Sequence, residues 1–240
     1  MSDTNNRPSG RIAGAGDLAG GVYGDVTIAG AGNVRGDIDA ITFKVAGTGD
    51  VAGKLSATTV SVSGTATFNG DVHAGTMTVS GTADVRGAVT ADVLKIAGST
   101  TVSGRVDAQR LEIRGTTRIG GDVQAEVFDA QGIFSVGGLL NAGTVNIRLY
   151  GGCDAHDIGG ERIEVALGRT WQWIPFFGDR NLTADTIEGD VVILENTRAK
   201  VVRGADVRIG SGCEIDLVEY TGTFVGSEGV RASRKVEPVA

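Results

Sequence analysis

Glycine recurs every 17 residues through the first half of the chain. One column of glycines runs from Gly30 to Gly132, and a second runs from Gly36 to Gly138. An apolar column with the same spacing comprises Val34, Val51, Phe68, Val85, Val102, Ile119 and Val136. A repeat this short and regular predicts a solenoid, in which each coil buries its apolar face only against its neighbours.

Within each repeat, apolar and polar residues alternate. Between Gly81 and Ala91 every second residue is apolar or small. This alternation indicates strands, and the small residues mark bends where a side chain would obstruct the backbone. The alternation shifts by one position between Ala91 and Leu94, which predicts another bend. We therefore expect an all-β fold, a parallel β-helix with coils of about 17 residues, and a right-handed one because parallel crossovers usually are.

The repeat divides the chain into five segments. Residues 1–10 are polar and are expected to form a disordered tail, and residues 11–167 a regular β-helix block. Residues 168–181 interrupt the repeat with an aromatic insertion. Residues 182–225 return to coils and form a second β-helix block, and residues 226–240 are expected to form a mobile C-terminal tail.

Composition favours a narrow coil over a thick globular core, because aromatic residues make up only 5% of the chain while glycines number 39. The net charge of −7 is spread along the chain, so no nucleic-acid partner is predicted. No long apolar segment gives a strong membrane signal. The only two cysteines, Cys153 and Cys213, fall at apolar positions of the repeat. We interpret them as core thiols, which fits a cytoplasmic location.

No group of residues predicts catalysis, a cofactor or a bound metal. His73 lies in an outward polar column, and His156 follows Cys153 by three positions without further ligands at metal-site spacing. The Gly-x-Gly pairs belong to the repeat and predict no phosphate site. Carboxylates in the column that starts at Asp37 alternate with neutral and basic residues, which is typical of a solvated surface. We therefore predict that the chain is not an enzyme.

Stacked hydroxyl groups form one further outward column. It comprises Thr48, Thr65, Thr82, Ser99 and Thr116. Such hydroxyls can hydrogen-bond along the stack, but an ice-binding face would need a second long ladder beside them, and the nearby threonines are too few.

These features resemble the bactofilins, the polymer-forming cytoskeletal proteins of bacteria. The resemblance lies in the 17-residue Val/Gly/Ala coils, the polar tails and the lack of helical caps over residues 11–225. The segments Glu195–Gly204 and Ile209–Tyr220 resemble the longer bactofilin-like proteins of Gram-positive bacteria. The resemblance implies filaments that form without nucleotide. The apolar N-terminal membrane anchor of short bactofilins has no counterpart in residues 1–10.

A mechanism for such assembly follows from the repeat, because a terminal coil leaves backbone groups and core side chains uncovered. We expect self-association of the chain with itself through its first and last coils. The candidate residues are Ile12, Leu18, Val22, Leu217, Tyr220 and Phe224.

Two alternatives stay open at this point. One is an adaptor that does not polymerise and binds another protein through an aromatic patch in the insertion. That patch comprises Trp171, Trp173, Phe176 and Phe177, since large exposed apolar patches usually mark interaction sites. The other is a β-helix enzyme that acts on polysaccharide, which would need carboxylates or basic residues gathered on one face.

Overall fold

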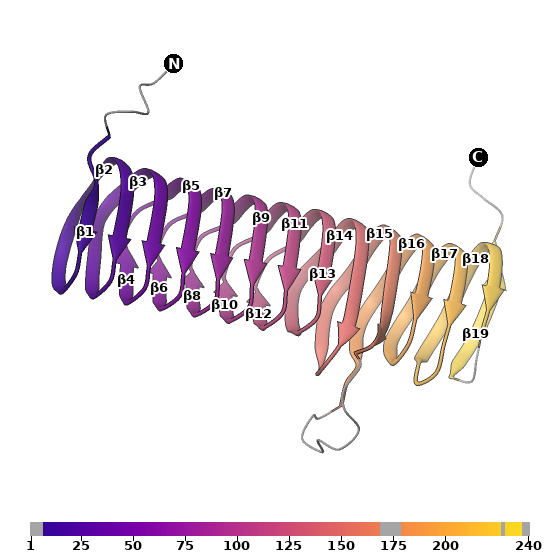
Figure 1. Ribbon diagram of the computed structural model, residues 1–240. Coiled ribbons are helices and arrows are strands. Elements are labelled where there is room, and N and C mark those ends of the chain that lie inside the picture. The colour runs from indigo at the N-terminus through magenta and orange to yellow at the C-terminus, as the bar shows by residue number, and fades with distance from the viewer. Residues whose placement is uncertain (1–6, 169–178, 227–228, 237–240) are drawn as a thin grey trace. The chain divides into compact units, whose positions relative to one another are not determined.

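The computed structural model describes residues 7–168, 179–226 and 229–236. The chain divides into two compact units, residues 1–120 and 121–240. Every regular element in the described residues is a β-strand, and each unit is a stack of coils joined by parallel pairing (Figure 1). The all-β parallel solenoid predicted from the sequence is therefore confirmed, whereas its right-handed sense and the predicted domain boundaries stay predictions.

The first unit contains twelve strands, β1 to β12. They are β1 (Gly10–Ile12), β2 (Ala15–Ile28), β3 (Ala31–Val45), β4 (Thr48–Val51), β5 (Leu55–Val62), β6 (Thr65–Phe68), β7 (Val72–Val79), β8 (Thr82–Val85), β9 (Val89–Ile96), β10 (Ser99–Val102), β11 (Val106–Ile113) and β12 (Thr116–Ile119). From β4 onwards each coil has one strand of four residues and one of eight, and each strand pairs in parallel with its equivalent 17 residues away.

The coil formed by β8 and β9 shows how the alternating sequence produces this fold. Ala83 and Val85 on β8 point into the core, as do Val89 and Ala91 on β9. Beyond Ala91 the buried positions shift by one residue, so that Leu94 is buried, as the sequence predicted. Full burial of each valine or leucine side chain contributes roughly 1.5–3 kcal/mol, and the parallel stack lines equivalent residues up in continuous apolar columns.

The second unit contains seven strands, β13 to β19. They are β13 (Val123–Ala130), β14 (Ile133–Leu149), β15 (Cys153–Leu167), β16 (Leu182–Leu194), β17 (Thr197–Ile209), β18 (Glu214–Val225) and β19 (Val230–Lys235). Strands β15 and β16 pair in parallel although residues 168–181 separate them. The insertion therefore follows one coil and precedes the next in the sequence, and these two coils still pair directly with each other.

Strands reach into both segments that the sequence predicts as tails. Residues 230–235 form strand β19, which pairs in register with β18. At the other terminus Gly10 belongs to β1, and Pro8 O accepts a hydrogen bond of 2.9 Å from Gly24 N. Arg7 Nη1 lies 2.6 Å from Asp39 Oδ1. Because these segments are polar, the apolar spacing that marks the other coils cannot be recognised in them.

The first glycine column is required by the close approach of successive coils. A Cβ atom on Gly81 would lie 2.0 Å from Gly64 O, and one on Gly98 would lie 1.9 Å from Gly81 O. Backbone carbonyl groups cannot move aside as a flexible side chain can. Glycine therefore sets the corner at which each coil lies against the one before it.

We predict that Gly81→Ala lowers the free energy of unfolding by about 2–3 kcal/mol, because the added Cβ forces two backbones apart. Gly14→Ala is the matched control, since a Cβ on Gly14 would meet nothing within 4 Å. Urea unfolding followed by circular dichroism measures both. Equal midpoints for the two variants would contradict the close-approach argument.

Two threonines lie inside the core of the first unit. Thr100 and Thr117 are 2% and 1% exposed, and they occupy paired positions on β10 and β12. Neither Oγ1 has a hydrogen-bond partner among the described residues. A buried hydroxyl without a partner destabilises a fold, because it loses its hydrogen bonds to water on folding.

We predict that Thr117→Val raises the free energy of unfolding by about 1 kcal/mol, because valine keeps the shape and removes the unpaired hydroxyl. Thr116→Val changes the exposed neighbour on the same strand and is expected to have little effect. Thermal unfolding of the two variants is the measurement. A lower melting temperature for Thr117→Val would show that its hydroxyl is satisfied in solution.

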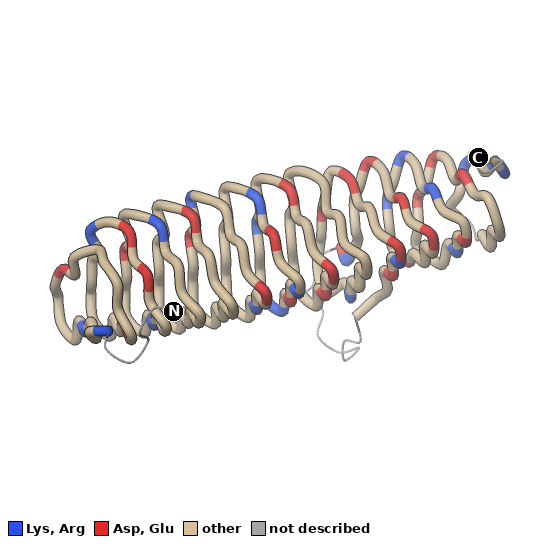
Figure 2. The backbone as a smooth tube through the Cα atoms, turned by 90° about the horizontal axis from the view of Figure 1, so that it is seen from above, with Lys and Arg blue, Asp and Glu red and all other residues tan. Residues whose placement is uncertain are grey.

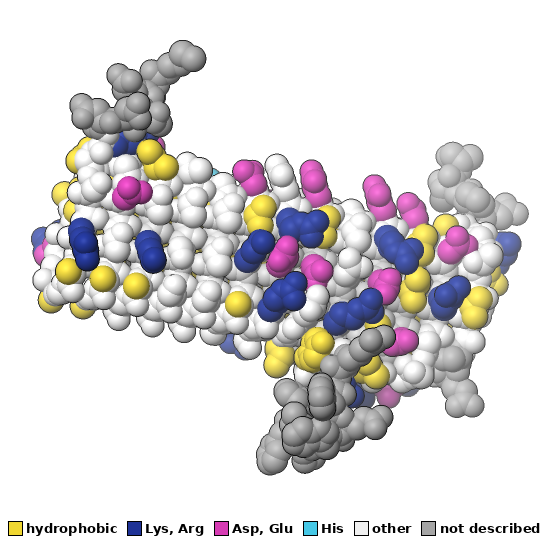
Figure 3. Space-filling view, viewed as in Figure 1, with side chains coloured by type: hydrophobic (Ala, Val, Ile, Leu, Met, Phe, Trp, Pro, Cys, Tyr) yellow, Lys and Arg dark blue, Asp and Glu magenta, His cyan; other side chains and the backbone are white. Residues whose placement is uncertain are grey.

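Charged side chains of both signs are distributed along the coils of each unit (Figure 2). On the face shown in Figure 3 acidic and basic groups are interspersed over the second unit. In the column that starts at Asp37, Lys54 Nζ lies 3.7 Å from Asp71 Oδ2. Asp37 and Asp71 also accept backbone hydrogen bonds from Lys54 and Ala88, at 2.8 and 3.0 Å. These carboxylates thus satisfy corner N–H groups of the following coil, a role that the sequence reading missed.

The hydroxyl column predicted on the surface is present. Its five members are all exposed and stand at paired positions of β4, β6, β8, β10 and β12.

Candidate functional site

The first coil leaves one edge without a neighbouring strand among the described residues. Strand β1 pairs only with the end of β2, and the first half of β2 pairs only with β3. Of the predicted site residues here, Ile12 is buried, Leu18 is half-buried and Val22 is 53% exposed. The edge thus offers both backbone hydrogen-bonding groups and apolar surface.

Leu18 and Tyr23 close the core at this edge. A Cβ on Gly10 would lie 2.8 Å from Leu18 Cδ2 and 3.5 Å from Tyr23 Cδ1. These two side chains therefore fill the space that a side chain at position 10 would occupy. The Tyr23 hydroxyl donates a hydrogen bond of 2.9 Å to Ala19 O. Apolar packing therefore finishes the core at the N-terminal coil.

The last coil forms a second strand edge, which is only partly covered among the described residues. Strand β19 covers residues 215–220 of β18, whereas residues 223–225 pair only with β17. Leu217, Tyr220 and Phe224 are half-buried, and the rings of Tyr220 and Phe224 lie 5.4 Å apart. Val225 beside them is 57% exposed. The structure thus places all three C-terminal candidate residues on the coil that carries the open edge.

Strand β19 pairs with β18 along the backbone, and its side chains add charged contacts, since none of its residues is buried. Glu219, only 8% exposed, lies between two guanidinium groups. Its Oε2 accepts a hydrogen bond of 2.7 Å from Arg203 Nε, and its Oε1 one of 2.7 Å from Arg234 Nε. Arg231 adds a second ion pair, 2.9 Å from Asp216. We call the group Arg203, Glu219 and Arg234 the glutamate clamp.

The glutamate clamp makes the attachment of β19 dependent on pH. Hydrogen bonds from Arg203 and then Arg234 hold the pKa of Glu219 below its usual value of 4.5. Because the folded pKa is lowered, the stabilisation is fully present above the usual value and is lost as the pH falls through the lowered one.

We predict that Glu219→Gln loosens the attachment of β19 at neutral pH. Hydrogen-exchange protection of residues 229–236, corrected for intrinsic rates, is expected to fall several-fold and to lose its acid dependence. Glu214→Gln is the control, because Glu214 on the same strand forms a 3.1 Å ion pair with Arg198 but is 69% exposed, where such pairs stabilise little. Equal protection in both variants would rule out the clamp.

The aromatic patch of the insertion lies outside the described residues. Trp171, Trp173, Phe176 and Phe177 all fall within residues 169–178. Its role as a partner surface stays a prediction.

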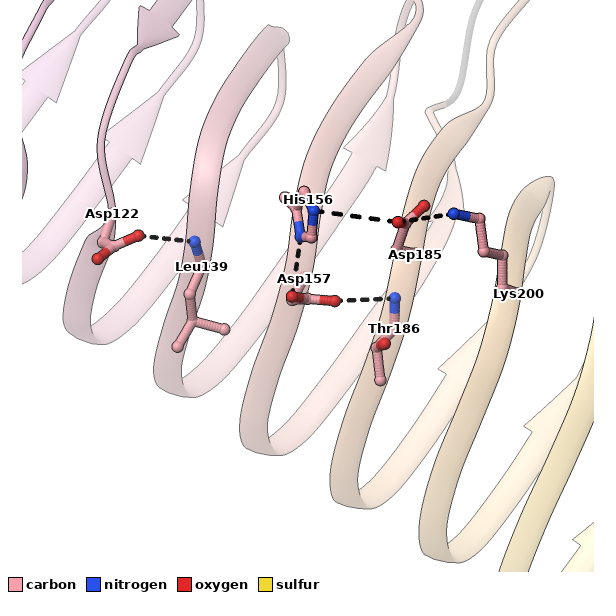
Figure 4. A network of polar contacts seen from close by, with 7 residues as sticks. All are labelled: Asp122, Leu139, His156, Asp157, Asp185, Thr186 and Lys200. Atoms are coloured by element: carbon pink, nitrogen blue, oxygen red, sulfur yellow. Dashed lines mark hydrogen bonds and ion pairs between the residues drawn. The ribbon is translucent and has the colours of Figure 1, made fainter.

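Cys153 and His156 do not form a joint site. Cys153 is buried, its Sγ donates to Gly132 O at 3.5 Å, and burial raises the pKa of its thiol to about 11. His156 points outward (Figure 4): its Nδ1 is 2.9 Å from Asp157 Oδ2 and its Nε2 is 4.0 Å from Asp185 Oδ2. No group of three or more His, Cys, Asp or Glu in the described part of the chain could hold a metal ion.

Lys200 completes this surface network, with its Nζ 2.8 Å from Asp185 Oδ2 (Figure 4). Asp157 Oδ1 accepts a hydrogen bond of 3.1 Å from Thr186 N, as Asp122 Oδ1 does from Leu139 N at 2.9 Å. Both carboxylates therefore repeat the corner role of Asp37 and Asp71. The network joins neighbouring coils, which accounts for these charged groups without a catalytic role.

A groove of about 990 Å³ crosses the second unit. Three stacked glycines, Gly160, Gly189 and Gly204, form part of its lining. Two of its carboxyl groups, Asp157 and Glu219, have a pKa held below the usual value by hydrogen bonds from His156 and Arg203. A glycosidase acid requires the opposite shift. Asp157 and Glu219 are therefore not suited to the role of such an acid.

The family of the chain follows from comparison with known proteins. A family model described as bactofilin, polymer-forming cytoskeletal, matches residues 5–87 and 67–140. Together these matches extend over more than half of the 240 residues. The chain belongs to the bactofilin family.

Two curated relatives come from Bacillus subtilis (strain 168). This bactofilin is 40% identical to the uncharacterized protein YhbE over 102 residues, which cover 41% of the chain and 43% of YhbE. It is 44% identical to the uncharacterized protein YhbF over 85 residues, which cover 34% of each. The chain thus spans less than half the length of either relative. No solved structure matches it.

The described residues of this bactofilin include no helix with the length and apolar character needed to cross a bilayer. Sequence reasoning did not find the glutamate clamp. A usable signal was present, because Asp216 and Glu219 each stand 15 residues before an arginine, Arg231 and Arg234, which is close to the coil spacing. Opposite charges at that interval would have predicted one more strand beyond β18.

Proposed function

We propose that this bactofilin is a cytoskeletal scaffold that self-assembles end to end through its two terminal coils and without nucleotide. The family description as polymer-forming supports this reading. The observation that carries it is the pair of open edges. At one edge strand β1 and the first half of β2 each pair on one side only among the described residues, and at the other edge the same holds for strand β19 and residues 223–225 of β18.

Open strand edges supply a driving force for such assembly. Each docking event pairs backbone groups that water otherwise solvates and removes apolar surface from water. This free energy comes from the contact alone, so hydrolysis of ATP or GTP is not needed for growth. The proposed role is therefore structural and not enzymatic.

Exposed apolar side chains also support these edges as contact surfaces. Four large apolar residues are strongly exposed in the described residues, namely Val22, Ile133, Leu139 and Val225. Val22 belongs to the first coil and Val225 to the last. Two buried free thiols, Cys153 and Cys213, fit a reducing cytoplasm.

We predict that Leu18→Arg and Phe224→Arg each weaken assembly at least about tenfold, because a charge placed in an apolar contact loses hydration without gaining a partner. Sedimentation and negative-stain electron microscopy of the purified chain across a concentration series measure the effect. Circular dichroism confirms that each variant is folded.

Leu139→Arg is the matched control, since Leu139 is apolar and 42% exposed but lies on β14, away from both terminal coils. It is expected to assemble like the parent chain. A parent chain that stays monomeric at high concentration would overturn the scaffold proposal and favour the adaptor alternative.

A further inference from the structure

We propose that the groove on the second unit binds an extended, positively charged peptide segment of another protein. The groove has a volume of about 990 Å³ and is lined by residues of β14 to β18. The side chains that carry the proposal, Leu139, Glu161 and Asp190, lie on β14, β15 and β16. They are therefore separate from the open edges on which the proposed function rests.

The groove exists because a column of alanines changes to glycine within the second unit. Ala125 and Ala142 stand at paired positions, and both are buried. The strand register continues this column to Gly160, Gly189 and Gly204, which line the groove. A Cβ on Gly189 would lie 2.4 Å from Gly160 O, so the close approach of these coils requires glycine. The floor of the groove is therefore backbone that another chain can approach closely, and it is a fixed part of the fold.

The length of the groove suits an extended peptide. Strands β14 to β18 belong to consecutive coils that pair in parallel. Four steps of about 4.8 Å between neighbouring strands give a length of about 19 Å. About six residues of extended chain, at about 3.3 Å each, span that length. The groove therefore fits a short extended segment better than a compact ligand.

The groove carries two carboxylates that no described residue neutralises. Glu161 on β15 and Asp190 on β16 both line it and are both exposed. They stand opposite each other, one position beyond the paired residues Gly160 and Gly189. Neither side chain forms an ion pair or a hydrogen bond within the described part of the chain. Like charges opposite each other on neighbouring strands are destabilising.

The other ion pairs between neighbouring coils of this unit combine opposite charges at paired positions. They are Lys200 with Asp185, Arg198 with Glu214, and Arg203 with both Glu188 and Glu219. The facing carboxylates of Glu161 and Asp190 depart from this arrangement, and they do so beside the hollow. A positively charged ligand in the groove would remove their repulsion, which is why we assign a basic segment to it.

An exposed leucine adds an apolar contact at the β14 end of the groove. Leu139 lines the groove and is 42% exposed. Its column carries Arg105 and Asp122 in the two preceding coils, so the fold accepts a polar side chain at this position. Exposed apolar side chains of this kind are typical of contact surfaces. The segment that fits the groove therefore combines basic residues with an apolar one.

Fluorescence anisotropy with a defined peptide tests the proposal. The probe is a fluorescein-labelled peptide of about six residues, the length that the groove spans, and contains lysines and one leucine. A second probe replaces each lysine with glutamate. We expect the full chain to bind the lysine peptide saturably, with an affinity that falls as salt is added, and not to bind the glutamate peptide.

The double variant Glu161→Gln with Asp190→Asn is expected to bind the lysine peptide at least about tenfold more weakly. Its melting temperature is expected to stay the same or to rise, because the change also removes the repulsion between the two carboxylates. The matched control is Asp84→Asn with Asp92→Asn, which neutralises two exposed carboxylates on the first unit and is expected to keep the parent affinity.

Leu139→Ser provides a second variant that keeps both carboxylates. It is expected to bind the lysine peptide several-fold more weakly, so the test stands even if the double variant fails to fold. Parent affinity in both groove variants, or equal binding of the glutamate peptide, would overturn the proposal. Absence of binding to the parent chain would also overturn it, and altered sedimentation of the double variant would then assign the groove to a second copy of the chain.

Discussion

The close approach of backbones at the corner glycines is the constraint on which the rest of this structure depends. At Gly64, Gly81 and Gly98 the space for a side chain is already occupied by a carbonyl group of the preceding coil. Each coil can therefore lie against its neighbour in only one register. With that register set, every apolar residue meets its equivalent one repeat away, and the core becomes a series of continuous columns.

Polar groups at the corners use the same register. Where the chain turns between strands, some backbone N–H groups point away from any strand partner, and an unpaired buried donor destabilises a fold. Asp37, Asp71 and Asp122 each accept the N–H of the residue 17 positions later. A Cβ on the glycine preceding that residue would collide with the carboxylate, as at Gly53, 2.3 Å from Asp37 Oδ1. At Gly53, Gly87 and Gly138 the second glycine column thus makes room for an aspartate on the coil before it.

Much of this fold could be predicted from the sequence, because spacing and alternation are local properties that the stack preserves. The shift of the buried positions between Ala91 and Leu94 is an example, since it needed only a change in the alternating pattern. The corner aspartates could not be recognised in the same way, because a carboxylate that accepts an N–H has the composition of an ordinary surface charge. Thr100 and Thr117 break the apolar pattern, yet only the structure shows that both remain in the core.

The candidate site was predictable in position but not in detail. Loss of the repeat located the two terminal coils, and Leu18 and Phe224 followed from their columns. The polar composition of residues 226–240 predicts a mobile tail, because the side chains of β19 are all at least partly exposed and give no alternating apolar pattern. The aromatic insertion gave the strongest compositional signal in the chain, but its four residues lie outside the described structure.

The two edges differ in how each one is completed, and that difference follows from what each coil lacks. At the first coil Gly10 leaves a gap in an apolar column, and Leu18 and Tyr23 fill it from the same coil. At the last coil β19 adds no buried side chain, and Arg234 supplements its backbone pairing with β18 by reaching back to Glu219. The side chains at one edge therefore contribute apolar packing, and those at the other contribute ion pairs, which are sensitive to salt and acid.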